Sequence, residues 1–456
     1  MTVAADTRSI TEVAPAIASG ELSPVDLMRT CLERIDERRS LNAFITVRAD
    51  AALAEARECQ AEIAAGRYRG PLHGVPISVK DLIDVVGTPT TSGSALPART
   101  PSRDATVVRR LKAAGGIIVG KTNLHEFAFG TTSDETAFGP VRNPHDTARS
   151  AGGSSAGAAV AVVEGMCFAS VGTDTGGSIR IPSAACGIVG LKPAFGEVPM
   201  DGIVPLSTTL DHVGPMTRTV ADAALLYDVM RGRRPAPITV HGSRVVFGVP
   251  RGYFFEKLDD GVGRAFDRAS RALGAAGHEV VDVSIANDVW TPDVYLHIVL
   301  PEAAAFHAPL LDNYGDRYSP GVRLRLEMGR YVLAEDYVRA MRLRETLTTQ
   351  VDAALANCDV LLLPGLAIPA PRIGATTVDI GEFKEPVRAA MLRLTQLFNL
   401  TGHPAIVVPA GDSDDGLPRS IQFVGRHGNT ARLLQIAAAA EGHIAAGPGS
   451  VGGGTG

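Results

Sequence analysis

The stretch "SRDATVVRRLKAAGGIIVGK", residues 102–121, contains the pattern that decides the fold class. Its first part has apolar residues at helical spacing and ends at Gly115, and a short apolar run, "IIVG", follows directly. The same order recurs in "AFDRASRALGAAGHEVVDV", residues 265–283, where Gly277 closes the helix. Helices that alternate with short apolar strands are typical of a sheet covered by helices. We therefore predict an α/β fold: a single large αβα sandwich with a mixed, mostly parallel central sheet and helices on both faces.

Two further apolar runs, each bounded by proline, extend this pattern: "DVLLLP" at 359–364 and "PAIVVPAG" at 404–411. The sequence contains no internal repeat and no linker long enough to separate two domains. We predict one domain over residues 1–445, with a variable lid or substrate region at roughly 230–350. Residues 446–456 are predicted to form a disordered glycine-rich tail.

The composition is ordinary for a globular protein: 456 residues, 45% hydrophobic and 20% charged, with a formal net charge of −5. This balance gives no basic surface for nucleic acid or an anionic membrane. No unbroken apolar run reaches the roughly 18 residues of a membrane helix. The five cysteines are scattered without a C-x-x-C pair, which is typical of reduced thiols: Cys31, Cys59, Cys167, Cys186 and Cys358. We expect a cytoplasmic protein without nucleic-acid or membrane partners, and a homodimer is compatible with the sequence.

Several common catalytic motifs are absent or lack their structural context. A literal G-x-S-x-G match at Gly153, Ser155 and Gly157 follows the polar loop "VRNPHDTARSA", whereas the serine hydrolases that use this motif need an apolar strand there. The chain has no H-E-x-x-H motif, no His/Cys cluster with zinc spacing and no phosphate-binding G-x-x-x-x-G-K-[ST] loop. We therefore expect no metal and no cofactor.

Two glycine–serine clusters, "GGSSAG" at 152–157 and "GTDTGGS" at 172–178, flank one short apolar stretch. Glycine at this density costs backbone entropy, so a close approach to the backbone is expected to require it. One interpretation is a pair of surface turns. The other is an active site built from backbone amides and two serines.

Lys80 is the third feature, because it lies in the apolar, strand-like segment "GPLHGVPISVKD" at 70–81. The simpler interpretation is a lysine at a strand end that extends to water. The functional interpretation is a buried base. Its pKa would have to fall from about 10.4 to about 7, which corresponds to roughly 4 kcal/mol of desolvation.

Together these segments resemble the amidase signature family. The motifs that carry the resemblance are "GPLHGVPISVKD", "GIIVGKTNLHEFAFG", "GGSSAG", "GTDTGGSIRIPSAACGIVGLKP" and "DHVGPMTRTVADAALL", followed by "DVLLLPGLAIPAP" and "FNLTGHPAIVVPAG". They occur in the family's order and span most of the chain, and the resemblance is weakest over roughly 230–350.

The resemblance implies a catalytic triad. Lys80 matches the family's catalytic lysine, Ser154 the bridging serine held on a cis peptide bond, and Ser178 the nucleophile. The two serines are 24 residues apart, as in the family. The backbone N–H groups of the loop that ends at the nucleophile would form an oxyanion hole, at Thr175, Gly176, Gly177 and Ser178.

Other motif residues receive supporting roles. Asp174 and Arg180 flank the nucleophile and are expected to fix the loop by hydrogen bonds or an ion pair, and Ser155 to support the hydrogen-bond network. The segment after "KTNLHEF" lines the acyl pocket in the family. The predicted substrate-binding residues are therefore Ala128, Phe129 and Gly130, together with Ser154.

The resemblance leads to two functional hypotheses. The first is an amidase that hydrolyses the C–N bonds of small amides, anilides or carbamates (urethanes), with esterase activity, through an acyl-enzyme. The alternative is the A subunit of a glutamyl-tRNA amidotransferase, which releases ammonia from glutamine. The segment "GVRLRLEMGRYVLAEDY" at 321–337 resembles that protein.

Overall fold

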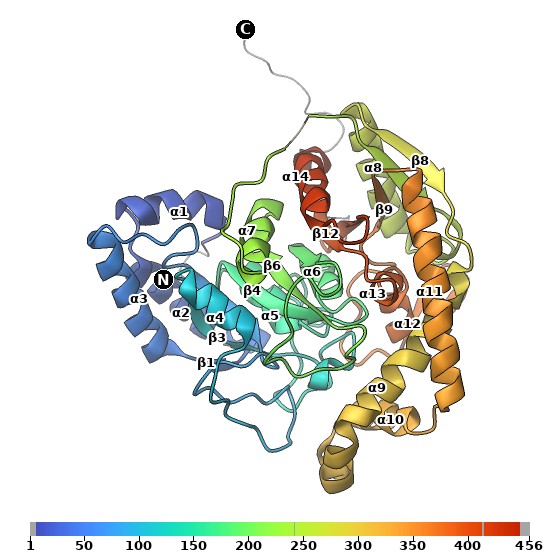
Figure 1. Ribbon diagram of the computed structural model, residues 1–456, viewed down its shortest axis with the longest axis horizontal. Helices are drawn as coiled ribbons and strands as arrows, with labels where there is room; N and C mark the ends of the chain where they lie inside the picture. Colours follow the sequence, from blue (N-terminus) through green and yellow to red (C-terminus); the bar gives the residue numbers. More distant parts are fainter. Residues whose placement is uncertain (1–5, 241, 413–414, 447–456) are drawn as a thin grey trace.

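The computed structural model describes residues 6–240, 242–412 and 415–446, so residues 447–456 of the predicted tail lie outside it. One 11-stranded sheet runs through the molecule (Figure 1). Its strands, in spatial order, are β1 (Phe44–Val47), β3 (Ile117–Thr122), β2 (Pro76–Lys80), β4 (Ala169–Asp174), β6 (His212–Thr217), β5 (Val189–Lys192), β12 (Ala405–Asp412), β13 (Pro418–Val424), β9 (Val360–Pro364), β7 (Val246–Pro250) and β8 (Glu279–Val283).

The sheet is mixed, as predicted. Parallel pairing occurs in two blocks of three strands, β3-β2-β4 and β9-β7-β8. The other six neighbouring pairs are antiparallel. The predicted parallel pairing is therefore found within these two blocks. The central part of the sheet alternates in direction.

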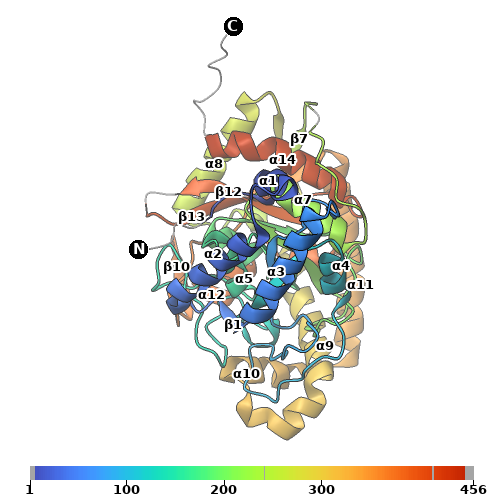
Figure 2. The same cartoon turned by 90° about the vertical axis from the view of Figure 1, so that its left-hand side faces the viewer.

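Helices cover both faces of the sheet. One row of helices in mutual contact consists of α4 (Thr106–Ala113), α7 (Val220–Met230), α14 (Thr430–Ala446) and α8 (Asp260–Ala275). The opposite face carries α5 (Ala156–Val163) and α6 (Arg180–Cys186), which also contact each other. Neighbouring residues of β3 mark the two faces, because Ile118 belongs to the larger hydrophobic cluster and Ile117 to the smaller one around α5. Figure 2 shows α8 and α14 on one side of β12 and β13, with α5 on the other.

The local signals in the sequence produce the predicted elements. The helix α4 is followed by Gly115 at a φ of +89° and then by β3, and α8 is followed by Gly277 at a φ of +90° and then by β8. The apolar runs at 359–364 and 404–411 supply β9 and β12. Near the N-terminus lie α1 (Ile10–Ser19), α2 (Pro24–Glu37) and α3 (Ala49–Ala64).

The region at roughly 230–350 has two parts. Its first half supplies β7, α8 and β8 to the central sheet. Its second half consists of α9 (Thr291–Tyr314), α10 (Pro320–Gly329) and the start of α11 (Ala334–Ala356), which pack on one another beside the sheet (Figure 1). The remaining elements are α12 (Val387–Leu392), α13 (Leu397–Leu400), the hairpin β10 (Thr377–Ile380) and β11 (Phe383–Pro386), and short 3₁₀ turns at Arg39–Leu41, Glu126–Ala128, Gly252–Phe254, Asp288–Trp290 and Gly315–Arg317.

One helical stretch of the described chain, Asp288–Arg317, is long and apolar enough to cross a membrane, with a mean hydropathy of 1.3. Half of its apolar window is buried inside the protein. Core helices of globular proteins meet the same criterion, and α9 packs against α10 and α11. The stretch is therefore weak evidence for a membrane span.

Candidate active site

Lys80 is the last residue of β2, a strand that lies between β3 and β4 and is buried along its whole length. Its side chain is fully buried, so it does not extend to water. Its Nζ lies 2.7 Å from the Ser154 Oγ and 2.9 Å from the Thr173 Oγ1. Burial lowers the pKa of Lys80 from 10.5 to about 7, against the nearby negative charges of Asp174 and Asp211. The site thus contains a lysine that is partly neutral at neutral pH.

Ser154 lies two residues before the start of α5, at the end of the preceding loop, and the peptide bond between Gly153 and Ser154 is cis. Its carbonyl oxygen accepts hydrogen bonds from the backbone N–H of His125 at 3.1 Å and the hydroxyl of Ser133 at 3.3 Å. The next residue, Ser155, donates its N–H to the carbonyl of Ser178 at 3.2 Å. This bond holds the loops of the two predicted catalytic serines side by side.

Thr173 was not singled out from the sequence, although it stands in the quoted motif "GTDTGGS". It lies on β4, the neighbour of β2, and its hydroxyl is the second partner of the Lys80 ammonium group. Its own carbonyl accepts a hydrogen bond from the Ser155 hydroxyl at 3.2 Å. Thr173 therefore connects the lysine with the serine loop, because parallel β2 and β4 bring both strand ends together.

The loop from Thr175 to Ser178 connects β4 to α6. Among the described residues, no acceptor is bonded to any of its four backbone N–H groups. Glycine is required at 177, where φ is +138° and a Cβ would lie 2.3 Å from the Thr395 hydroxyl. The same hydroxyl donates to the carbonyl of Gly176 at 2.5 Å, which orients that peptide. The loop can therefore present free N–H donors to a substrate oxygen.

Asp174 and Arg180 form a buried bidentate ion pair at the two ends of this loop. The Arg180 Nε and Nη2 each lie 3.0 Å from a carboxylate oxygen of Asp174. Asn399 and Gln422 accept further hydrogen bonds from Arg180, at 2.7 and 2.8 Å. Burial by itself raises the pKa of Asp174, but the Arg180 charge outweighs this and the pKa lies well below its ordinary value. The pair fixes the loop, and sequence reasoning missed its two amide partners because they come from distant segments.

Ser178 is only 6% exposed. Its hydroxyl forms no hydrogen bond with Ser154 or Lys80 among the described residues. Such contacts are commonly longer in the absence of substrate. The loop beside it is held by Asp211, whose carboxylate accepts the Thr175 hydroxyl at 2.6 Å. Burial raises the pKa of Asp211 to about 6.

The segment predicted to bind the acyl group is buried as well, with Ala128 4% and Phe129 1% exposed. Glycine is required at 130, because a Cβ there would lie 2.1 Å from the His125 ring. The Phe129 ring lies 5.4 Å from the Arg325 guanidinium and 5.7 Å from that of Arg388. Two guanidinium groups therefore lie close to the ring of this segment.

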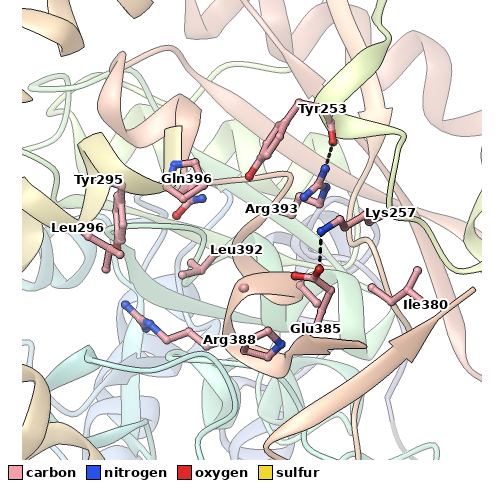
Figure 3. Close-up of a pocket in the computed structure, with 14 residues that line it drawn as sticks. Tyr253, Lys257, Tyr295, Leu296, Ile380, Glu385, Arg388, Leu392, Arg393 and Gln396 are labelled. Atoms are coloured by element: carbon pink, nitrogen blue, oxygen red, sulfur yellow. Dashed lines mark hydrogen bonds and ion pairs between the residues drawn. The ribbon is translucent and has the colours of Figure 1, made fainter. Parts of the chain in front are cut away.

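A cavity of about 290 Å³ opens next to the nucleophile loop, between α9 and α12 (Figure 3). It does not reach the triad itself. Two of its lining residues, Tyr295 and Leu392, lie against Gly176, where a Cβ would be 2.5 and 3.1 Å from their side chains. No group of three or more His, Cys, Asp or Glu residues in the described parts of the chain is arranged to hold a metal ion.

The family model for "Amidase" matches residues 26–434. The chain belongs to the amidase family. It is 39% identical over 453 residues to an amidase of Pseudomonas putida, with 95% of each chain covered. It is also 36% identical over 471 residues to the A subunit of the glutamyl-tRNA(Gln) amidotransferase of Chloroflexus aurantiacus, with 94% of this chain and 95% of that protein covered. A crystal structure of an amidase matches the fold with a TM-score of 0.90 and 39% identity, covering 94% and 98% of the two chains.

These findings confirm the amidase signature family and its fold. The amidase-family chain is accordingly a hydrolase that acts on amide C–N bonds. Its relatives include both amidases and amidotransferase subunits, so the family alone leaves the substrate open.

Proposed function

We propose that this chain is an amidase that hydrolyses small amides, anilides or carbamates through an acyl-enzyme on Ser178, with Ser154 and Lys80 as the proton relay. The observation that carries the proposal is the 2.7 Å contact between the Lys80 Nζ and the Ser154 Oγ in a fully buried site. A lysine whose pKa burial lowers to about 7 can accept a proton near neutral pH.

In the proposed reaction the Ser178 Oγ forms a bond to the substrate carbonyl carbon. Its proton passes to Ser154 while Ser154 gives its own to the neutral Lys80 amine. Thr173 accepts an N–H of that amine and so directs the nitrogen lone pair toward Ser154. The Ser154 hydroxyl thus acts as a bridge, and no further base is needed.

The negative charge that develops on the carbonyl oxygen would be stabilised by the free N–H groups of residues 175–178. Each such donor is typically worth about 2.7–4 kcal/mol of barrier. The C–N bond then breaks, and the proton returns from Lys80 through Ser154 to the leaving amine. Water attacks the acyl-enzyme by the same relay and releases Ser178.

Amides, anilides and carbamates share this route, because each forms a tetrahedral oxyanion and releases an amine. Esters share the oxyanion and release an alcohol. The cavity beside Gly176 is a suitable size for a small substituent, and most of its lining is apolar or aromatic, including Tyr253, Leu296 and Ile380. Carbamates are less electrophilic than amides, so their turnover depends on the fit in this cavity.

The second candidate function is the A subunit of a glutamyl-tRNA amidotransferase, which the 36% identity to a protein of that kind favours. In that case the chain would release ammonia from glutamine with partner subunits. Glutaminase activity that appears only in the presence of the partner subunits would support this alternative.

A cytoplasmic location is part of the proposal as well. All five cysteines, which lie in the described residues, are free and buried, which is consistent with a reducing cytoplasm. The single amidase domain over residues 1–445 and the homodimer also remain predictions.

The proposal is tested with aliphatic amides, aryl anilides, carbamates, esters and glutamine as substrates. Wild-type protein is compared with Ser178→Ala and with Ser284→Ala, a control at an exposed position after β8. Ser178→Ala should lose turnover of every substrate, because it removes the nucleophile and little packing, and its thermal unfolding should match the wild type. Amide hydrolysis at a near-wild-type rate in Ser178→Ala would refute the assignment.

A further inference from the structure

Three positively charged side chains are among the described residues that line the cavity next to Gly176, and they differ in whether a carboxylate is bonded to them (Figure 3). Lys257 forms an ion pair with Glu385 at 2.5 Å. Arg393 donates to the carbonyl of Tyr253 at 2.5 Å and lies 3.2 Å from Glu256. Two of the three positive charges that line the cavity are therefore matched by carboxylates.

Arg388, on α12, is the third cation. Its side chain forms no hydrogen bond or ion pair with any described residue, and its Nη2 is buried without a partner. Figure 3 shows its guanidinium on the side of Tyr295 and away from the pair of Lys257 and Glu385. The Arg388 side chain as a whole is half-buried. A charge that is partly withdrawn from water without a partner is costly, and arginines in such places are normally bonded to a carboxylate or phosphate. No carboxylate of the described residues is bonded to Arg388; the charge of Glu135 acts on it, but Glu135 is bonded to Arg325.

The Phe129 ring provides a comparison within the same site. Two guanidiniums lie near it, those of Arg325 and Arg388, at 5.4 and 5.7 Å. Arg325 is bonded to a carboxylate oxygen of Glu135 at 3.0 Å, whereas no carboxylate of a described residue is bonded to Arg388, and the Glu135 charge acts on it only at longer range. Burial lowers the pKa of Arg388 to about 10, so it keeps its charge at neutral pH. One positive charge without a bonded carboxylate therefore lines the cavity.

We propose that Arg388 binds an anionic group of the substrate, such as a carboxylate, so that the enzyme prefers amides that carry a negative charge. The inference rests on the proposed amidase function and names its substrate class. A guanidinium can hold a carboxylate by two parallel hydrogen bonds, which gives both affinity and orientation.

The helix α12 relates this subsite to the reacting atoms. Leu392 lies four residues after Arg388 and therefore on the same helix face, about 6 Å along the axis. It is Leu392 that lies against Gly176 of the nucleophile loop. The anionic group must therefore be separated from the reacting carbonyl by a spacer of several bonds. Half-amides of dicarboxylic acids and amides of aminobenzoates meet this requirement.

Two matched substrate pairs test the inference on the full-length enzyme. In the first, the mono-anilide of glutaric acid is compared with its methyl ester, and the release of aniline is measured. In the second, N-acetyl-4-aminobenzoate is compared with N-acetyl-4-aminobenzamide, and the release of 4-aminobenzoate or 4-aminobenzamide is measured. The variants are Arg388→Met, which keeps the length without the charge, Arg388→Lys, and the control Arg339→Met at an exposed position of α11.

The measured quantity is the ratio of kcat/KM for the anionic and the neutral member of each pair. The wild type and Arg339→Met should favour the anion in at least one pair. Arg388→Met should lower that ratio about 100-fold, and Arg388→Lys should restore part of it. If Arg388→Met does not fold, Arg388→Lys and the wild-type preference still provide the test.

An unchanged ratio in Arg388→Met, or no preference for the anion in either pair, overturns the inference. In both cases the neutral substrates are still hydrolysed, so the proposed amidase function stands. Failure of that function would appear differently, as no hydrolysis of any amide by the wild type.

Discussion

If Lys80 is the base, its buried amine should set the acidic limb of the pH–rate profile. Its pKa lies at about 7. About half of the lysine is then neutral at pH 7, compared with about 1 in 3,000 at an ordinary pKa of about 10.4–10.5. Burial thus increases the fraction of usable base by about three orders of magnitude. Because the base must be neutral, kcat/KM should rise with pH and level off above about 7.

The assay is anilide hydrolysis by wild-type, Lys80→Met and Lys80→Arg protein from pH 5 to about 10. For the wild type, kcat/KM at pH 5 should be about 100-fold below the plateau, which follows from a single ionisation at pH 7. Both variants should lose about 10³-fold or more, since the guanidinium does not release its proton and methionine has no amine to accept one. Activated esters should be affected less, because their leaving group needs no proton. Restoration of amide hydrolysis by Lys80→Arg would show that position 80 needs only a cation, and the mechanism would be wrong.

The same burial predicts a change in stability. Between pH values of about 7 and 10.5 the unfolded chain holds the Lys80 proton and the folded chain does not, so the free energy of unfolding rises with pH. At pH 7 the shift corresponds to a cost of about 4 kcal/mol. Lys80→Met removes this cost and two hydrogen bonds worth about 1 kcal/mol each. We expect a gain of about 2 kcal/mol at pH 7 in urea unfolding, which shrinks toward pH 10. Equal or lower stability at pH 7 would contradict the assigned burial.

Two further predictions concern the effect of metal chelators and the nucleophile loop. Chelators should leave the activity unchanged, since the proposed relay uses only Lys80, Ser154 and Ser178, and a loss that zinc restores would argue against it. Gly176→Ala should lower kcat/KM about 100-fold, because the new methyl group would lie 2.5 Å from the Tyr295 hydroxyl and displace the loop. The control Gly274→Ala, on α8 with open space around its Cβ position, should keep full activity and gain up to about 1 kcal/mol. Equal kinetics in the two glycine variants would remove the loop from the mechanism.

Local sequence patterns determined the helices, strands and motifs. The transition from helix to glycine to strand at 102–121 and at 265–283 depends on neighbouring residues only, and α4–β3 and α8–β8 follow from it. The family motifs identified Lys80 and Ser154, which the structure places 2.7 Å apart although 74 positions separate them. Hydrogen bonds or an ion pair of Asp174 and Arg180 were also predicted, because both residues flank one short loop, and the structure contains the ion pair.

The tertiary structure alone decided which distant side chains complete the site and which charges stay unmatched. Thr173 meets Lys80 because β2 and β4 are parallel neighbours, and Thr395 bonds to the carbonyl of Gly176 from 219 positions away. Whether a lysine or arginine is buried, and whether it has a carboxylate partner, depends on all the elements packed around it. The sequence near Lys80 allowed both an exposed and a buried amine, and the sequence near Arg388 carried no signal. Burial and pairing are properties of the packed chain, because the cost of a charge depends on what replaces water around it.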